Sequence, residues 1–210
     1  MRAVNRVIFL KVMHSMKLET VHPIYMTAPE RYQGTFLDYA QLKEFERMPE
    51  YEFPADFLQS AFAKGDRCYG FLTHEGRLAA YQWYSTKPTW FFAPSRVSGW
   101  NGAVVNFDEE YVYMYKGFTH PRHRGRRLYP IGVSTALSTY LAQGYKGIVS
   151  IVESNNFASL HACYRMGYED FGMIYLTILF GTCLIHADST CHAMGFRLTA
   201  AKTLPTGSHS

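Results

Sequence analysis

The chain has 210 residues and a mass of 24.1 kDa; 48% of its residues are apolar and its formal net charge is +4. This length predicts one domain over residues 1–200, followed by a flexible polar tail over 201–210. The mild positive charge suits an anionic small ligand or an acidic protein partner, and it is too small for nucleic-acid binding.

The first residues are basic, but the apolar run between Arg6 and Lys11 is only four residues long. That run is too short for a secretory signal, and no stretch of the chain reaches the length of a membrane-spanning helix. We therefore expect a cytoplasmic protein without a membrane span.

The first helix is expected shortly after Thr35. Thr35 and Asp38 form a weak capping box, and apolar residues then recur at helical spacing as far as Met48. Pro49 ends this helix.

A second helix and a β-hairpin follow. The helix begins at Pro54 and stops at Gly65. Residues 67–73 and 77–85 are strand-like, and the compact turn between them, residues 74–76, makes them a hairpin.

Residues 86–108 predict a long loop, because prolines and glycines interrupt them throughout. The large aromatic residues of this loop are Trp90, Phe91, Phe92 and Trp100. They either line an apolar pocket for an acyl chain or an acceptor, or they pack the loop onto the core.

The second half of the chain alternates strands with helices. Strands are expected over residues 110–119, 148–152, 168–180 and near 192–199, and helices over 130–144 and 156–166. Residues 173–184 are apolar enough to form a buried strand pair. Such alternation predicts parallel pairing in a mixed sheet covered by helices, an α/β fold.

Metal binding is not expected. The string Cys183, His186, Cys191 and His192 has the appearance of a ligand set. Zinc sites pair two close ligands with a second, distant pair, and apolar neighbours such as Leu184 make a buried strand the simpler interpretation.

One helix carries the most informative motif of the chain. Its residues are Asn156, Ser159, Tyr164, Gly167 and Tyr168, in the spacing N-x-x-[AS]-x-x-x-x-Y-x-x-G-[FY]. This layout resembles the second acyl-donor motif of the Gcn5-related N-acetyltransferase (GNAT) superfamily. The resemblance covers residues 110–180 and implies the GNAT fold, in which two central strands splay apart and helices flank the sheet.

The resemblance also implies a function. It predicts an N-acyltransferase that moves an acetyl or longer acyl group from acetyl-CoA or another acyl-CoA to a primary amine of a small molecule, by direct attack. The pantetheine arm of the donor would lie in the gap between the splayed strands. Tyr164 would donate a proton to the departing thiolate, because a phenol with a pKa of about 10 is protonated at neutral pH.

Four further residues are implied to contact the donor. Asn156 would cap its helix or bond the pantetheine amides, with Asn155 as the alternative cap. Ser159 would allow close approach of the donor. Backbone groups near Phe118 and Thr119 would bind the pantetheine amides and the oxyanion.

The phosphate-binding loop of the family follows the pattern [QR]-x-x-G-x-[GA]. The matching segment is Arg124, Gly125, Arg126, Arg127, Leu128 and Tyr129. Arg124 matches the pattern, whereas Arg127 and Tyr129 occupy its two small positions. A register that begins at Arg122 would place Pro130 deeper in the helix, at a cost of about 3 kcal/mol.

The arginines of this loop allow three interpretations. Arg122, Arg124, Arg126 and Arg127 can hold the phosphates of coenzyme A through bidentate contacts. They can also dock an acidic acyl carrier protein, or they can form a solvated basic turn.

Glu110 is the candidate general base, because it begins the strand that faces the donor. Asp108 and Glu109 have equal standing, and a solvated acidic turn is the alternative for all three. His120 and His123 have suitable pKa values but lie on the phosphate side.

Two rival functions remain: an acyl-carrier-protein-dependent N-acyl amino acid synthase, and a non-catalytic module that binds acyl-CoA or an amine.

Overall fold

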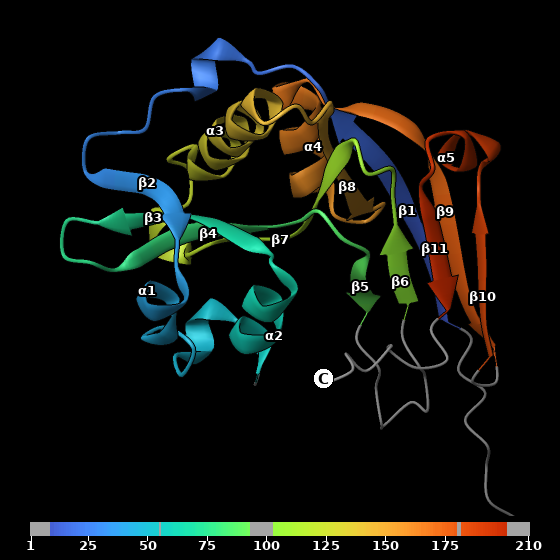
Figure 1. The fold of residues 1–210 in the computed structure, drawn as a ribbon, viewed down its shortest axis with the longest axis horizontal. Helices are drawn as coiled ribbons and strands as arrows, with labels where there is room; N and C mark the ends of the chain where they lie inside the picture. The colour runs from blue at the N-terminus through green and yellow to red at the C-terminus, as the bar shows by residue number, and fades with distance from the viewer. Residues whose placement is uncertain (1–8, 55, 93–102, 180–181, 201–210) are drawn as a thin grey trace, which may run out of the picture.

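The fold is built on a large mixed β-sheet (Figure 1). A computed structural model describes residues 9–54, 56–92, 103–179 and 182–200, so the predicted tail 201–210 lies outside the described residues. The strands of the large sheet are β1 (Phe9–Leu18), β2 (Tyr32–Leu37), β3 (Arg67–Thr73), β4 (Leu78–Ser85), β7 (Tyr111–Thr119), β8 (Gly147–Glu153), β9 (Glu169–Leu179) and β10 (Thr182–Ala187). They pair in the order β10-β9-β1-β8-β7-β4-β3-β2, and the predicted α/β class is confirmed.

A second, smaller sheet consists of β5 (Thr89–Phe92), β6 (Ala103–Asn106) and β11 (Arg197–Ala200), in the order β11-β6-β5. The prediction of one long loop over 86–108 is therefore wrong at both ends of that segment. The two short strands pair with each other, and β6 also pairs with β11 from the end of the chain. Trp100 lies outside the described residues.

The first strand of the chain lies in the middle of the large sheet. β1 pairs antiparallel with β8 on one side and with β9 on the other. Its side chains Met13, Met16 and Leu18 are buried, as expected for a strand that is covered on both faces. β9 and β10 form the strand pair predicted over residues 173–184, and they run antiparallel. The pair is not buried as predicted, because β10 is the edge strand of the sheet and Leu184 on it is 56% exposed.

β7 and β8 separate part-way along their length. They run parallel but pair only between residues 111–114 of β7 and 147–150 of β8. Beyond Met114, β7 continues to Thr119 with β4 as its partner. The predicted splay of the central strands is confirmed, and it leaves one edge of β7 without a neighbouring strand.

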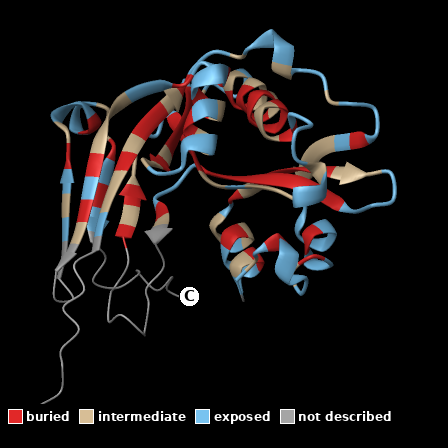
Figure 2. Ribbon diagram, turned by 180° about the vertical axis from the view of Figure 1, so that it is seen from behind, coloured by how far each residue is buried: buried red, intermediate tan, exposed pale blue. Residues whose placement is uncertain are grey.

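Helices cover both faces of the large sheet (Figures 1 and 2). The helices are α1 (Tyr39–Lys43), α2 (Phe57–Lys64), α3 (Leu128–Ala142), α4 (Phe157–Met166) and α5 (Ser189–Ala193), with 3-10 turns η1 (Pro23–Tyr25), η2 (Pro49–Tyr51) and η3 (Pro121–His123). α3 and α4 share one buried cluster with the sheet. α1 and α2 pack on the opposite face, where the small sheet covers the neighbouring strands. None of the described helices is long and apolar enough to cross a membrane.

Local sequence accounts for α3 and α4. The apolar residues of α3 face the sheet, and Gly144 follows its end in a left-handed conformation, with φ +94°. Asn156 caps α4 by accepting a hydrogen bond from the Ser159 N–H, and Gly167 ends it with φ +90°. These helices begin and end within two residues of their predicted bounds.

Two predicted elements need correction. The first helix ends at Lys43 rather than at Met48, and its capping box joins Asp38 with Gln41 because Thr35 belongs to β2. The last strand begins at Arg197 rather than at His192, since α5 occupies the residues before it.

A β-bulge lies where β7 leaves β8. Trp83 pairs with Lys116 and Tyr84 with Met114, so Tyr115 is the extra residue of β7. A bulge redirects side chains locally. Here it brings the consecutive residues Tyr115 and Lys116 to one cavity on the α2 face.

Candidate functional site

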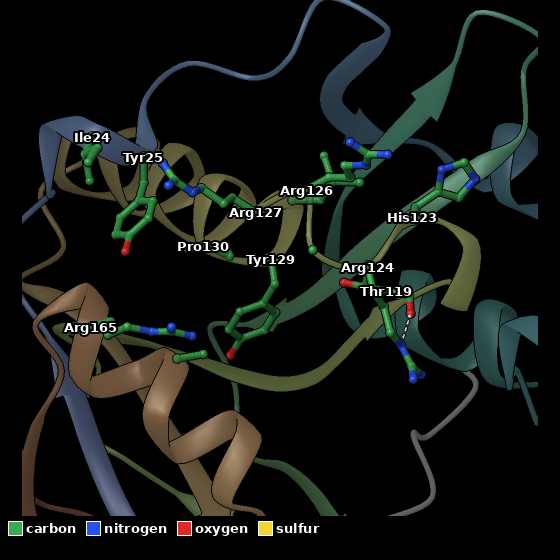
Figure 3. A pocket seen from close by; sticks show the side chains of 13 residues that line it. Ile24, Tyr25, Thr119, His123, Arg124, Arg126, Arg127, Tyr129, Pro130 and Arg165 are labelled. Atoms are coloured by element: carbon green, nitrogen blue, oxygen red, sulfur yellow. Dashed lines mark hydrogen bonds between the residues drawn. The ribbon is translucent and has the colours of Figure 1, made fainter.

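A cleft of about 490 Å³ opens at the N-terminus of α3 (Figure 3). Its walls come from η1, the end of β7, the loop before α3, the first turn of α3, and α4. The lining residues are Ile24, Tyr25, Thr119, His123, Arg124, Gly125, Arg126, Arg127, Leu128, Tyr129, Pro130, Ala162 and Arg165. The structure thus brings together Thr119 and the whole predicted segment from Arg124 to Tyr129.

The loop before α3 depends on two left-handed residues. Gly125 has φ +74° and Arg127, at the N-cap of α3, has φ +61°. Glycine adopts this conformation freely, whereas a residue with a Cβ atom loses about 1–2 kcal/mol. The family pattern has a glycine at position 127. The left-handed backbone of this residue explains why a glycine suits the position.

The first turn of α3 is suited to bind an anion. Among the described residues, no side chain caps this helix of 15 residues. The N–H groups of Leu128 and Tyr129 and the positive end of the helix dipole therefore remain for a ligand, whereas Pro130 has no N–H to donate. Arg124, Arg126, Arg127 and Arg165 line the same cleft, and guanidinium groups match the oxygens of a phosphate. Arg124 donates from Nε to the Thr119 carbonyl at 3.3 Å.

Tyr129 occupies the gap between the splayed strands. A Cβ atom added to Gly117 of β7 would lie 2.9 Å from Cε2 of Tyr129, so the ring packs directly on the β7 backbone. The Tyr129 hydroxyl donates to Sδ of Met114 at 3.9 Å. Met114 is the last residue of β7 that pairs with β8. The phenol therefore lies at the apex of the gap.

Burial keeps two side chains at this apex protonated. The ring of Tyr129 borders the cleft, but its hydroxyl lies inside, and burial raises its pKa well above the ordinary value of a phenol. Cys163 of α4 is fully buried beside it, and burial raises the pKa of that thiol to about 11. Both groups are therefore protonated at neutral pH.

Buried polar groups without a partner lie next to the gap. The side-chain amide of Gln82 is fully buried, and neither of its polar atoms has a hydrogen-bond partner within the described part of the chain. Gln82 lies under α3, where a Cβ atom on Gly132 would clash with its Oε1. Unpaired buried amides are rare in proteins and are commonly satisfied by water or a ligand.

The backbone N–H groups of Phe118 and Thr119 point to opposite edges of β7. The His120 N–H donates to the Ala79 carbonyl of the β4 side. Because strand N–H groups alternate in direction, the Phe118 N–H also points to β4, and those of Gly117 and Thr119 point to the gap. The Phe118 ring stacks on Tyr81 on the α2 face. Of the two residues predicted for this edge, Thr119 therefore presents its N–H to the gap and Phe118 does not; their role toward a donor stays a prediction.

Asn156 and Ser159 lie on α4 outside the residues that line the cleft. The side chain of Asn156 is occupied by capping, as predicted. Ser159 precedes Ala162 by three residues and so shares its helix face. Their roles toward the donor remain predictions.

Tyr164 points away from the cleft. Its side chain is 48% exposed, and its hydroxyl donates to Oδ2 of Asp170 in β9 at 3.5 Å. His14 contacts the same carboxylate oxygen. Tyr164 is not among the residues that line the cleft, so its predicted role as proton donor has no support from its position.

Glu110 lies at the closed end of the strand pair. It forms an exposed ion pair with Lys146, just before the residues where β7 and β8 pair. Like Tyr164, it does not line the cleft. Asp108 is also turned away, since its side chain accepts from the Glu110 N–H at 2.9 Å.

The sequence did not predict Arg165, Ile24 and Tyr25 of the cleft. Arg165 follows Ala162 by three residues, and this helical spacing was the available signal. Ile24 and Tyr25 come from η1, far away in the sequence, and no local pattern points to them.

Over the described ranges, no three His, Cys, Asp or Glu side chains gather as a metal site.

No protein-family model matches the sequence, and no curated protein matches it. Solved structures match its fold. A tandem GNAT protein from the clavulanic acid biosynthesis pathway has a TM-score of 0.54 at 14% identity, over 84% of this chain and 55% of its own. An acetyltransferase of the GNAT family from Colwellia psychrerythraea has a TM-score of 0.51 at 15% identity, over 80% of this chain and 56% of its own.

A Gcn5-related N-acetyltransferase-like protein from Streptococcus suis has a TM-score of 0.51 at 11% identity, over 81% of this chain and 62% of its own. The chain therefore has the GNAT fold, as the motif on α4 predicted. It spans between about half and two thirds of the length of these three structures. Identities this low establish the fold alone, and the activity must be argued from the site.

Proposed function

We propose that the protein is an acyltransferase that moves an acetyl or longer acyl group from an acyl-CoA to the primary amine of a small molecule. One observation carries the proposal. An arginine-lined cleft at the N-terminus of a long helix borders the open gap between β7 and β8, and a buried phenol lies at the apex of that gap.

The cleft suits the donor from its phosphates to its arm. The phosphates would bind at the first turn of α3, between the arginines of the loop and Arg165 of α4. The arm would follow the unpaired edge of β7, where the N–H groups of Gly117 and Thr119 can bond its amides. The ring of Tyr129 lies across this path and would shift to admit the arm.

The chemistry needs one proton donor and no covalent intermediate. The amine nitrogen attacks the thioester carbonyl, a C–N bond forms, and the C–S bond breaks. Tyr129 donates its proton to the departing sulfur, and the proton lost from the amine restores the phenol. The raised pKa of Cys163 leaves its thiol a poor nucleophile, which favours direct attack by the amine.

One observation favours a second function. Because the Tyr129 ring fills the gap beside Gly117, a protein in which it stays there would bind the phosphates of coenzyme A without placing the thioester. Such a protein would be a non-catalytic binding module.

Two measurements test the proposal. Calorimetry with coenzyme A should give a dissociation constant that rises about tenfold in an Arg165→Glu variant at low salt and stays constant in Arg47→Glu, an exposed arginine outside the cleft. Thiol release from acetyl-CoA and longer acyl-CoA should then be followed with a panel of primary amines.

Binding with thiol release supports the acyltransferase, whereas binding without release across the panel supports the module. Thiol release from acyl-carrier-protein thioesters, without release from acyl-CoA, would show that the donor is an acyl carrier protein. Absence of coenzyme A binding together with absence of release from either donor would overturn the proposal.

A further inference from the structure

A second cavity lies on the opposite face of the large sheet. It has a volume of about 620 Å³ and lies between α2, the small sheet and β7. Figure 1 shows α2 and β5 on the same side of β4 and β7, across the sheet from α3. We call it the α2 cavity; the function proposed above does not use it.

The α2 cavity reaches β7 at the point where the strands separate. Tyr115 and Lys116 line it, and they directly follow Met114, the last paired residue. From the other face, the Tyr129 hydroxyl approaches the same Met114 side chain at 3.9 Å. The α2 cavity and the Tyr129 hydroxyl therefore approach the same part of β7 from opposite faces of the sheet.

One charged group of the cavity wall is already satisfied. Asp66 is 3% exposed, and its Oδ2 accepts from the Tyr115 hydroxyl and from Nζ of Lys64, both at 2.8 Å. Lys64 also donates to Oγ1 of Thr89. This set is neutral as a whole and ties α2 and β5 to β7, so it shapes the cavity without needing a ligand.

Lys116 has no ion-pair partner of the kind that Lys64 has in Asp66, because no carboxylate lies within ion-pair distance of it over the described ranges. Its ammonium group lies 5.9 Å from the ring centroid of Phe57, and Glu52 acts on it only at longer range. Lys116 is partly buried, and burial lowers its pKa because the charged form loses hydration. An anion beside Lys116 would relieve that cost.

Most of the remaining wall is apolar; Asp56 and Ser60 of the α2 side are its polar members, and Asp56 is not within ion-pair distance of Lys116. Phe57 of α2 faces the cavity together with Trp90 of β5 and Val104 of β6. Two aromatic side chains and an aliphatic one favour a hydrophobic body in the ligand.

We propose that the α2 cavity binds the acyl acceptor, and that the acceptor is an amino acid with an apolar side chain, its carboxylate on Lys116 and its side chain between Phe57 and Trp90. This inference rests on the proposed acyltransferase function. The amine nitrogen reaches the thioester carbonyl through the gap at Met114 and forms the amide as the C–S bond breaks. The proton it loses ends on the thiol through Tyr129.

The test uses L-phenylalanine and L-phenylalaninol, which share the amine and the ring and differ in the carboxylate. Binding is measured by calorimetry without donor, and thiol release with acyl-CoA is measured separately. Phenylalanine should bind the unmodified protein, and a Lys116→Met variant should lose roughly tenfold or more in affinity, since a charge-assisted contact is removed. Phenylalaninol should bind both proteins equally, and Lys43→Met, an exposed lysine of α1, is the matched control.

The outcomes separate this inference from the function on which it rests. Phenylalanine binding that depends on Lys116, without thiol release, supports the cavity assignment and contradicts the acyltransferase. Thiol release that is as fast with phenylalaninol, or unchanged in Lys116→Met, supports the acyltransferase and overturns the assignment. Absence of phenylalanine binding by the unmodified protein also overturns the assignment. Circular dichroism checks that each variant is folded.

Discussion

Replacing Tyr129 by Phe removes one hydroxyl from the apex of the gap and leaves the ring in place. The stability cost should be small. The hydroxyl bonds Sδ of Met114 at 3.9 Å and interacts with the thiol of Cys163, and sulfur is a weak acceptor. Loss of such a bond costs under about 1 kcal/mol, which lowers the melting temperature by roughly 2–4 °C in a protein of this size.

The kinetic cost should be much larger. A positioned general acid contributes roughly 10²–10⁴-fold to rate, or about 3–5 kcal/mol of the barrier. Turnover should therefore fall by at least about a hundredfold in the Tyr129→Phe variant, while the dissociation constant of coenzyme A changes little. Because burial raises the pKa of Tyr129, the phenol stays protonated as pH rises, and its loss of a proton should not lower wild-type turnover below about pH 10.

The assay follows free thiol during turnover with the best amine from the panel, and calorimetry gives donor affinity. Tyr164→Phe is the matched control, since it removes the same atom from an exposed tyrosine of α4. If Tyr129→Phe kept turnover within about twofold and Tyr164→Phe lost it, the phenol that serves the reaction would be the one the sequence motif indicated. The reasoning from the gap would then be refuted.

Three further predictions concern stability and the base. Asp66→Ala should lower the free energy of unfolding by about 3 kcal/mol in urea, because it removes the buried carboxylate that the Tyr115 hydroxyl and the Lys64 ammonium share; a loss below about 1 kcal/mol would contradict this. Gly117→Ala should cost about 1–3 kcal/mol, but almost nothing in a Tyr129→Ala background, since the added Cβ meets that ring; equal costs would show that the ring does not pack there. Glu110→Gln should leave turnover unchanged, because this carboxylate pairs with Lys146 away from the cleft; a large loss of turnover would restore Glu110 as the base.

Much of the cleft at the start of α3 could be predicted from local sequence. The bounds of α4 follow from the Asn156 cap and the left-handed Gly167, which act within one helical turn. The arginine-rich loop could be placed before α3 because Pro130 fits the first turn of a helix. These signals are short-range, so a single sequence carries them in full.

The orientation of side chains around the gap could not be predicted in this way. Tyr164 has the spacing of the motif, but the packing of α4 on the sheet turns it toward Asp170 in β9. Tyr129 is a departure from the family pattern, and only the approach of α3 to Gly117 places its ring in the gap. The face that a helix presents to a site depends on what it packs against, and this is a property of the assembled fold.

By itself, the sequence determined the succession of strands and helices in the second half, the GNAT fold, and the basic loop at the start of α3. Tertiary structure decided three other features: the position of β1 beside β8, the phenol at the apex, and the α2 cavity around Lys116. Periodicity and capping act between residues a few positions apart. Strand pairing and cavities join residues that only the folded chain brings into contact.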